Sequence, residues 1–449
     1  MPSPERNAAR PARGVSAALW RKEVRELLLS RAFGLLLVAV GLLVGHSFIT
    51  AVETYAEMSG AGGGASALPQ GLSPLDGILV PTFGAYDLAA TLLLPFVVIR
   101  TFGAERATGG WALLVQSPVR TRTMIVVKAG ALLAGWLVAL VPGLVAVALW
   151  RSYGGHVNGA ELLTLLAGHL LRAGISVGIA AAMAGIAPQP ATAAVATLGV
   201  TVGLWALDFM AATNGGLAEQ FAAFGPAAAL RQFEQGLVRA STVVVLLAVL
   251  GVGLVTAGLW SAPGRRMRTR VRANGATLLV AVLLALLAAR LPWSWDTSED
   301  QRHSFSPEIA AALRSIPGEL TVEAHLAPED PRLADLRRGV LARMERVFST
   351  HVELRGGGGR TGLFAHPDSS YGEIWYSLAG KRVMERSTID NIVVETVLRL
   401  AGKPMPTASA ESAYYGYSMN SKPRFAAIFF FFAWPMCVFA IFWQARRVT

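Results

Sequence analysis

The sequence is poor in cysteine, in charged residues and in regular glycine repeats, and each shortage excludes a class of protein. Cys437 is the only cysteine, so no disulfide can form within one chain, and a disulfide-stabilised scaffold is excluded. Charged residues make up only 15% of the chain, which excludes an intrinsically disordered protein. Glycine does not recur at every third position, which excludes a collagen-like fibre.

Motifs of common enzymes are also missing. There is no Gly-x-x-x-x-Gly-Lys-Ser/Thr run to cradle a nucleotide's phosphates, no His/Cys cluster with metal-ligand spacing and no Gly-x-Ser-x-Gly turn. His325, His351 and His366 lie on or near predicted strands and loops, where solvated histidines are far commoner than catalytic ones. We therefore expect no enzyme, no metal site and no cofactor bound by this chain.

What the sequence does contain is apolar residues, which make up 53% of it and give a mean hydropathy of +0.47. This composition is typical of a membrane protein. The net charge of +11 could instead indicate nucleic-acid binding, but residues 290–424 contain 17 basic and 17 acidic residues, so the whole surplus falls in the apolar remainder. There it flanks the apolar runs, as in membrane proteins, and no nucleic-acid partner is expected.

Eight apolar runs are long enough to cross a bilayer, which takes roughly 17 to 25 residues. We predict spans near residues 32–51, 83–101, 124–149, 162–186, 191–212, 241–260, 274–291 and 425–443. The uncharged link from Pro188 to Pro190 marks either a turn or a break within one helix.

The distribution of Lys and Arg predicts the orientation of these spans. Seven basic residues precede the first span, and five each lie at residues 100–128 and 265–272, whereas residues 52–82 contain none. The positive-inside rule then places both termini in the cytoplasm of the cell and residues 292–424 on the opposite side of a plasma membrane.

Residues 1–31 are predicted to be a cytoplasmic tail that ends in an amphipathic helix. Leu19, Trp20, Val24, Leu27 and Leu28 recur at helical spacing, and charged residues fill the other face. Such a helix suits the headgroup layer of a membrane, but the pattern fits an ordinary charged start to a span equally well.

Residues 292–424 have a soluble composition and are predicted to form a small α/β domain outside the membrane. Ser306-Pro307-Glu308 is a typical helix start, residues 320–326 alternate as a strand, and a second helix begins at Asp330-Pro331. Further strands are expected at 352–354, 374–378 and 382–384, with a last helix near 389–400. Strands that alternate with helices predict this fold class.

The cytoplasmic connection from Gly103 to Arg120 is charged at its start and contains a proline near its end. Held close to the bilayer by two spans, it could pass a force from a soluble partner into the helices, although a plain cytosolic loop is the simpler interpretation. Its distinctive residues are Glu105, Arg106, Thr108, Gly109, Leu113, Leu114, Ser117 and Pro118, and Lys128 follows after an apolar stretch.

This stretch resembles the cytoplasmic signature of ABC-2 type transporter permeases, which have an acidic-basic pair, a Leu-Leu pair, a Ser-Pro-Val and a later Lys at this spacing. Lys22-Glu23 resembles the N-terminal helix of the same family, and the resemblance covers residues 16–261 and six spans. It departs from the family at Gly110-Trp111. The resemblance implies that residues 103–120 dock on a separate ATPase, which would bind ATP and Mg.

A second resemblance begins at Asp296 and runs to Pro307. It is similar to the opening of the extracytoplasmic domain of gliding-motility auxiliary ABC components, and it extends to the helix that ends near Leu400. That family has a second soluble domain which this chain lacks. The chain is thus similar to a permease half, residues 32–261, joined by a basic linker, residues 262–273, to a shortened auxiliary half whose last span and cytoplasmic C-terminus are residues 425–449.

Ionisable residues inside the predicted spans are functional candidates because a charge in hydrocarbon costs at least ~2.5 kcal/mol. These residues are His46, Asp87, Glu161, His169, Arg172 and Asp208. Asp87, Glu161 and Asp208 lie near predicted span ends, where we expect them to reach the interface. His169 and Arg172 share one helix face, which we expect to point into protein or a wet cavity, as a structural pair or a functional one.

Together these patterns predict a fold of eight membrane helices plus a small α/β domain. The expected function is that of a permease subunit in a bacterial ABC complex, as a homodimer or heterodimer, which couples a partner ATPase dimer to export or to movement of the outer domain. A rival hypothesis is a non-transporting mechanotransmitter or assembly factor for envelope machinery such as motility or pili. The sequence does not name the client or an envelope partner.

Overall fold

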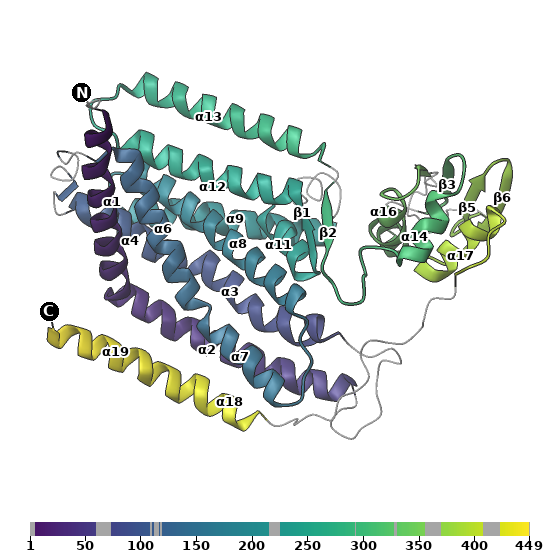
Figure 1. Cartoon of the computed structure of the whole chain (residues 1–449), viewed down its shortest axis with the longest axis horizontal. Helices are drawn as coiled ribbons and strands as arrows, with labels where there is room; N and C mark the ends of the chain where they lie inside the picture. Colours follow the sequence, from purple (N-terminus) through teal and green to yellow (C-terminus); the bar gives the residue numbers. More distant parts are fainter. Residues whose placement is uncertain are drawn as a thin grey trace, which may run out of the picture. The chain divides into compact units, whose positions relative to one another are not determined.

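The computed structural model describes residues 5–59, 73–107, 110, 111, 116, 119–214, 225–291, 293–326, 330–354, 370–406 and 423–448. Contacts divide the chain into two compact units. The membrane unit consists of Met1–Thr297 and Tyr414–Thr449, and the second unit is Ser298–Ala413. The membrane unit is almost wholly helical, whereas the second unit contains a four-stranded sheet (Figure 1).

Eight helical segments among the described residues are long and apolar enough to cross a membrane. They are Arg31–Met58, Leu75–Gly103, Thr121–Ser152, Gly159–Ile186, Pro190–Asp208, Ala240–Ser261, Met267–Ala288 and Arg424–Gln444. Each overlaps one of the eight runs predicted from hydropathy. The lengths and compositions of these helices indicate a multi-pass membrane protein.

The helices of the membrane unit follow the chain in a simple order. They are α1 (Glu5–Leu28), α2 (Arg31–Ser59), η1 (Leu75–Leu79), α3 (Val80–Leu92), α4 (Leu94–Ala107), α6 (Thr121–Ala139), α7 (Val141–Ser152), α8 (Gly159–Ile186), α9 (Pro190–Asn214), α11 (Pro226–Glu234), α12 (Ala240–Ser261), α13 (Met267–Ala288), α18 (Arg424–Ile428), η3 (Phe429–Ala433) and α19 (Trp434–Val448).

Prolines explain where the helices are interrupted. The second span changes from α3 to α4 next to Pro95, and the third changes from α6 to α7 next to Pro142. Proline lacks the N–H that continues the hydrogen-bond ladder, so each site bends a span without ending it. At Pro188, by contrast, α8 has already ended at Ile186 and α9 begins at Pro190, so the uncharged link is a turn between two helices.

Helix α8 is the most central element of the bundle, and glycines allow its close packing on α12. A Cβ at Gly253 of α12 would lie 2.3 Å from the carbonyl oxygen of Gly178, so the two backbones touch. The glycines of α9 do not serve such packing among the described residues. A Cβ at Gly199 or Gly203 would meet nothing within 4 Å.

The last span packs on the first. The ring of Trp434 fills the space beside Gly41, where a Cβ would lie 2.1 Å from the indole, and the indole Nε1 donates to the carbonyl oxygen of Leu37 at 2.8 Å. Phe430 and Phe442 occupy the same kind of space at Gly45 and Gly34. The N- and C-terminal spans are therefore neighbours, although almost four hundred residues separate them.

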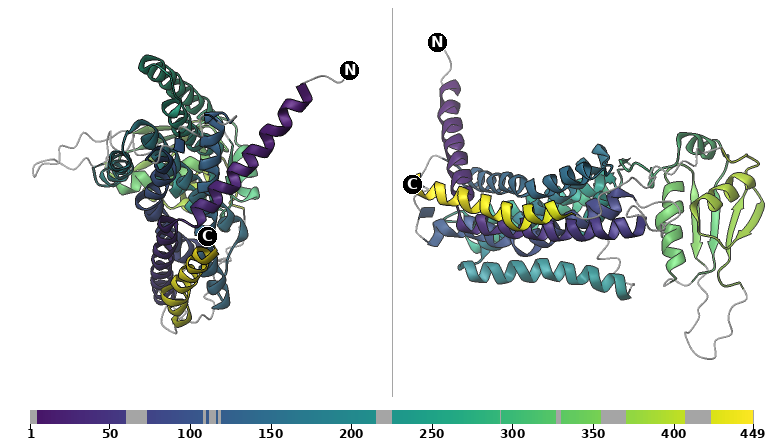
Figure 2. Two further views of the ribbon diagram at one scale, coloured as in Figure 1. Left: turned by 90° about the vertical axis from the view of Figure 1, so that its left-hand side faces the viewer. Right: turned by 90° about the horizontal axis from the view of Figure 1, so that it is seen from below.

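Helix α1 lies differently from the spans. Both Figure 1 and Figure 2 show it crossing the ends of the long helices, with its C-terminus at the start of α2. Glu23 and Leu27 are buried, whereas Trp20, Arg21, Arg25 and Glu26 are exposed. Of the two interpretations that the sequence left open, this arrangement favours the interfacial helix.

A short ribbon also belongs to the membrane unit and was not foreseen. β1 (Leu237–Arg239) pairs antiparallel with β2 (Ser294–Asp296), so residues assigned by composition to the start of the outer domain pair with the segment before α12. The hydroxyl of Thr297 donates to the carbonyl oxygen of Gly236 at 2.8 Å and continues this connection.

The second unit has one mixed sheet in the order β4-β3-β5-β6. β3 runs parallel to β4 and antiparallel to β5, and β5 runs antiparallel to β6. Its elements are α14 (Pro307–Arg314), β3 (Leu320–Ala324), α15 (Pro331–Leu336), η2 (Arg337–Leu341), α16 (Ala342–Met344), β4 (Thr350–Leu354), β5 (Ile374–Leu378), β6 (Lys381–Glu385) and α17 (Asp390–Leu400). The predicted α/β composition of this region is present, and alternate residues of β3 and β5 face an apolar core.

Two local predictions in this unit need correction. The helix predicted to begin at Asp330-Pro331 is not continuous, because Gly339 has non-helical dihedral angles and the segment is divided into α15, η2 and α16. Ile389, the predicted start of the last helix, precedes α17 and is 62% exposed. The predicted cap is present: the Ser306 hydroxyl accepts from the backbone N–H of Ile309.

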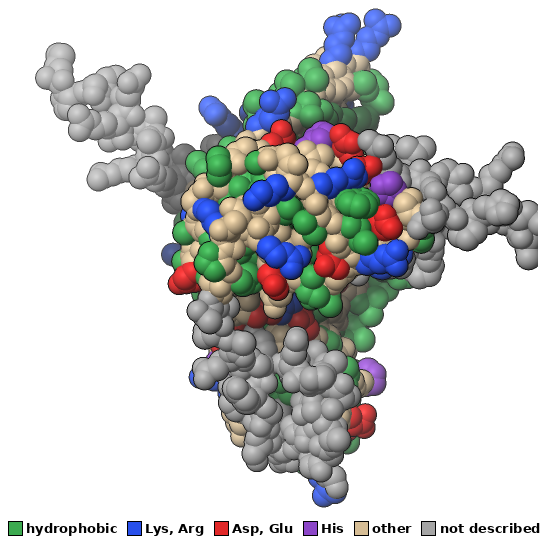
Figure 3. Space-filling view, turned by 90° about the vertical axis from the view of Figure 1, so that its right-hand side faces the viewer, with side chains coloured by type: hydrophobic (Ala, Val, Ile, Leu, Met, Phe, Trp, Pro, Cys, Tyr) green, Lys and Arg blue, Asp and Glu red, His purple; other side chains and the backbone are tan. Residues whose placement is uncertain are grey.

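The outer surface of this unit mixes charges of both signs. The face seen in Figure 3 has basic side chains beside acidic ones. Within this unit, Arg382 pairs with Glu323 at 2.6 Å and Arg386 with Glu373 at 3.5 Å. Such a surface is typical of a solvated domain and presents no strong field of one sign in this view.

Candidate functional site

The first candidate site is a charge cluster where α1, α4 and α6 meet. We call Lys22, Glu23, Glu26, Glu105 and Lys128 the terminal cluster. The Lys128 ammonium lies 2.9 Å from Glu23 Oε2 and 3.1 Å from Glu105 Oε2, and it also donates to the carbonyl oxygen of Thr101 at 3.3 Å. Lys22 lies 2.8 Å from Glu105 Oε1 and 3.2 Å from Glu23 Oε1.

The terminal cluster has a buried centre, and its edge, Lys22 and Glu26, is 39% and 59% exposed. The side chains of Lys128 and Glu23 are 2% exposed, and that of Glu105 is 14% exposed. Lys128 is the charged residue within the apolar stretch 124–139 of α6, and its ammonium lies among groups of α1 and α4. Three elements that are far apart in the sequence are thereby tied together by paired charges.

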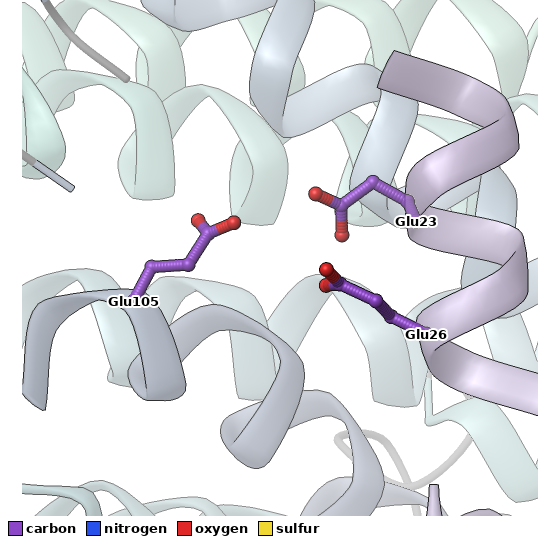
Figure 4. Close-up of side chains that lie close together, drawn as sticks. All are labelled: Glu23, Glu26 and Glu105. Carbon is purple, nitrogen blue, oxygen red and sulfur yellow. The ribbon is translucent and has the colours of Figure 1, made fainter. Parts of the chain in front are cut away.

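The three carboxylates of the terminal cluster converge from α1 and α4, as Figure 4 shows. One oxygen from each of Glu23, Glu26 and Glu105 lies within 4.8 Å of the others, a spacing that can hold a metal ion. Lys22 and Lys128, however, contact these same carboxylates at 2.8 to 3.4 Å. The protein's own ammonium groups thus supply the positive charge that a cation would bring.

The electrostatics of Lys22 fit this arrangement. Partial burial lowers the pKa of Lys22, but the hydrogen bond to Glu105 and the charges of Glu23 and Glu105 outweigh it, so the pKa is raised above its ordinary value. Lys22 therefore keeps its charge across the physiological range.

The structure places only part of the predicted coupling segment. Glu105 belongs to the terminal cluster, and Arg106 lies in α4, although its side chain is outside the described part. Thr108, Gly109, Leu113, Leu114, Ser117 and Pro118 also lie outside the described residues. Trp111 is described, and its indole Nε1 donates to the carbonyl oxygen of Ser261 at the end of α12 at 3.3 Å.

The second candidate site lies inside the bundle around His169 and Arg172, and with Asp87 and Glu234 we call it the internal cluster. Arg172 is 7% exposed. Its Nε lies 2.7 Å from Asp87 Oδ1, and its terminal nitrogens donate to Thr91 Oγ1 at 2.6 Å and to Ser176 Oγ at 3.1 Å. The guanidinium thus holds α8 against α3 through the ion pair with Asp87 and the hydrogen bond to Thr91, whereas its bond to Ser176 stays within α8.

Asp87 shows why its interpretation from sequence was wrong. It was placed near the start of a span beginning at residue 83, but the helical segment begins at Leu75. Asp87 therefore lies about 18 Å along the span, at 1.5 Å per residue. Its carboxylate is 25% exposed and reaches Arg172, not a membrane surface.

His169 is the least satisfied polar group of the internal cluster. It is 1% exposed, and neither ring nitrogen has a hydrogen-bond partner among the described residues. Its Nε2 lies 3.9 Å from Glu234 Oε1, beyond hydrogen-bond distance, and the rings of Phe83 and Tyr86 lie 5.7 and 6.1 Å away. Both His169 and Arg172 point into protein, as the sequence predicted of this helix face.

Helix α11 supplies the residues of this region that sequence reasoning missed. It follows the fifth span and packs on α8, with the Phe233 ring against Gly168. Its alternation of Leu230 and Phe233 on one face with Arg231 and Glu234 on the other is the signal that could have revealed it.

Glu234 and Arg231 have contrasting environments. Burial, together with the negative charge of Asp87, raises the pKa of Glu234 to about 7, and Arg231 opposes this effect only in part. Arg231 makes a two-pronged bond to Asp208 at 2.8 and 2.6 Å, which raises its own pKa. Asp208 therefore has a partner within the protein, which its interpretation as an interfacial side chain did not foresee.

The space around Arg172 is nearly filled. The pocket lined by Asp87, Arg172, Thr201 and Trp205 has a volume of about 10 Å³. That is at the lower limit for a single water molecule. In this conformation the internal cluster is a packed polar core and not a wide passage.

Comparison of the chain with protein-family models, curated proteins and solved structures finds no match in any of the three.

Proposed function

We propose that this chain is the membrane subunit of an ABC complex of the ABC-2 permease type, driven by a separate ATPase that docks near residues 103–120. In this proposal both termini lie in the bacterial cytoplasm, the second unit lies outside the plasma membrane, and two membrane subunits assemble on an ATPase dimer. ATP and Mg bind to the partner. No step requires a cofactor on this chain.

The observation that supports this proposal is the terminal cluster. The resemblance to permeases rests on Lys22-Glu23, on Glu105 and on Lys128, which lie in three separate stretches of sequence. In the structure these four residues contact one another, with ion-pair distances of 2.8 to 3.2 Å. A push on the segment after α4 would therefore act on α1 and α6 together.

The geometry also separates two roles within the docking segment. Glu105 is held inside by Lys22 and Lys128, so in the proposal it positions the segment and does not contact the ATPase. Direct contact falls to Arg106 and the residues that follow it. This division sharpens the prediction for charge reversal, because Glu105→Lys would disturb the membrane subunit itself.

The test uses the chain co-purified with its ATPase and reconstituted in liposomes. Arg106→Glu is expected to abolish the stimulation of ATP hydrolysis by the membrane subunit while leaving insertion and thermal stability unchanged. The matched control is Arg122→Glu, an equal charge change at an exposed position at the start of α6. Normal stimulation with Arg106→Glu would refute the docking role.

A specific observation argues against export through the interior of one subunit. Transport within one subunit needs a continuous polar cavity, whereas the pocket at Arg172 has only about 10 Å³. We therefore favour, as a second candidate, a complex that transmits ATP-driven movement to the extracytoplasmic unit and acts on envelope machinery.

This second candidate can be tested without knowing a client. Spin labels on the second unit and on the membrane unit, in a Cys437→Ser background, would report their separation in liposomes. A distance distribution that changes between ATP-bound and ADP-bound complexes is expected from mechanotransmission. Identical distributions in the two states, with a functional ATPase, would exclude it.

A further inference from the structure

Two separate grooves, with no lining residue in common, lie at the end of the bundle where α1 meets α2 and α19. The first, of about 670 Å³, lies between α1 and the C-terminal part of α19 and is lined by Arg21, Arg25, Leu28 and Ile441 among others. The second, of about 300 Å³, lies between α2 and α19 and is lined by Arg31, Leu35, Val38 and Phe439 among others. Figure 1 and Figure 2 show α19 passing beside α2 toward this end.

The charges at these grooves are not neutralised by the protein. Arg21, Arg25 and Arg31 are exposed, and no carboxylate within ion-pair distance of them occurs in the described part of the chain. Of the acidic residues on this part of α1, Glu23 is buried and paired with Lys128, and the exposed Glu26 is paired with Lys22. Both carboxylates therefore have lysine partners, whereas Arg21 and Arg25 have no ion-pair partner in the described part of the chain.

The walls of the grooves are apolar over most of their length. Leu35 is 71% exposed, and Phe439 and Ile441 are each 62% exposed. Trp20 and Trp443, both partly exposed, lie at the same end of the bundle. Exposed tryptophans and arginines at the ends of spans mark the headgroup level of a bilayer, and the apolar wall then faces the acyl chains.

We propose that each of these grooves binds an anionic phospholipid, with the phosphate at Arg21 and Arg25 in the first groove and at Arg31 in the second, and with acyl chains along the apolar walls. Basic pockets beside membrane helices bind acidic headgroups through such charges. Arginines beside an apolar wall favour a lipid over a soluble anion, because a free phosphate makes no favourable contact with apolar side chains. The lipid in the first groove contacts α1 and α19, and the lipid in the second contacts α2 and α19.

The experiment uses the purified full chain, stripped of lipid by detergent exchange, with native mass spectrometry to count bound lipid. Phosphatidylglycerol and phosphatidylcholine with identical acyl chains are the probes. Wild type is expected to bind phosphatidylglycerol more tightly, and the triple variant Arg21→Gln/Arg25→Gln/Arg31→Gln to lose this preference, by about fivefold per arginine removed. The control Arg122→Gln/Arg268→Gln/Arg272→Gln removes the same charge from exposed arginines elsewhere in the chain and should leave the preference unchanged.

Two further measurements separate the parts of the proposal. Leu35→Trp narrows the apolar wall and is expected to weaken both lipids without changing the preference for phosphatidylglycerol. Glycerol phosphate, which has the charge but no acyl chain, should not displace the bound lipid. Equal binding of the two lipids to wild type, equal losses in the triple variant and its control, or displacement by glycerol phosphate would each overturn the proposal.

Discussion

The terminal and internal clusters both place charged side chains inside a largely apolar molecule, but they do so in different ways. In the terminal cluster each buried charge has an opposite charge within about 3 Å. Lys128 bridges two carboxylates, and Lys22 contacts three. In the internal cluster Arg172 has an ion pair and two hydrogen bonds, whereas His169 has no hydrogen bond within the described part of the chain and lies 3.9 Å from Glu234. The charges of the terminal cluster are therefore paired, whereas the internal cluster contains polar groups that lie near each other without a hydrogen bond.

This difference indicates a structural role for the terminal cluster and a capacity to change protonation for the internal cluster. A complete buried network gives a fixed geometry, because the removal of any one charge leaves another buried charge without a partner. An incomplete one has groups whose protonation can change with small rearrangements. In the proposed complex, the terminal cluster is thus suited to transmit force without deforming. The internal cluster is the one whose protonation would respond to a conformational change.

The largest expected effect is on the terminal cluster. Lys128→Met leaves Glu23 buried without its main partner and is expected to lower the free energy of unfolding by about 3 to 5 kcal/mol. Lys22→Met, at a side chain that is 39% exposed, should cost far less. Chemical unfolding in detergent measures both.

A double variant provides the control for this prediction. Glu23→Leu/Lys128→Met removes both charges and should recover much of the stability lost in Lys128→Met, because no charge is left unpaired. A double variant as unstable as Lys128→Met would mean that packing, and not the ion pair, gives the residue its importance.

The next effect comes from Glu234 and depends on pH. Its pKa of about 7 in the folded protein lies above the ordinary 4.5, so the folded state binds the proton more tightly than the unfolded state. The native state therefore loses stability as pH rises from about 4.5 to 7. Glu234→Gln should flatten this slope and stabilise the protein at pH 8 by up to about 3 kcal/mol.

Thermal unfolding from pH 5 to 8 measures this effect, and Glu234→Asp serves as the charge-conserving comparison. If Glu234→Gln shows the same decline with pH as wild type, another group in the internal cluster titrates there.

A smaller effect is expected at Arg172. Arg172→Lys keeps the ion pair with Asp87 but cannot reach Thr91 and Ser176 at the same time, so it should cost about 1 to 2 kcal/mol of unfolding free energy. Thr91→Val removes a single one of these bonds and should cost about half as much. An Arg172→Lys variant as stable as wild type would show that the guanidinium fork is not needed.

The smallest effect is expected at the exposed ion pair between Arg231 and Asp208. Arg231 and Asp208 make a two-pronged pair, but Arg231 is 52% exposed. Arg231→Gln should lower the unfolding free energy by at most about 1 kcal/mol, and the difference should shrink at high salt. A loss of unfolding free energy that is independent of salt and well above that value would mean that this pair behaves as a buried ion pair, like that of Arg172.

Much of the architecture could be predicted from residue patterns because the signals are local. Eight apolar runs predicted eight membrane helices, and Ser306-Pro307 predicted the start of α14. Predictions failed where a boundary or a partner depended on distant residues. Asp87 was misplaced because its helix begins eight residues earlier than the apolar run, and α11 was missed because its short pattern gains meaning only against α8.

The sequence by itself determined which segments avoid water and which start or end a helix, since hydropathy, prolines and caps act over a few residues. Only the tertiary structure decided that Glu23, Glu105 and Lys128 meet. It also decided that Arg172 reaches Asp87, whereas His169 has no hydrogen bond to any residue that the structure describes. The physical reason is the sequence separation over which each interaction acts. Burial and ion pairing depend on contacts between helices far apart in the chain, and no local pattern specifies which charges those contacts bring together.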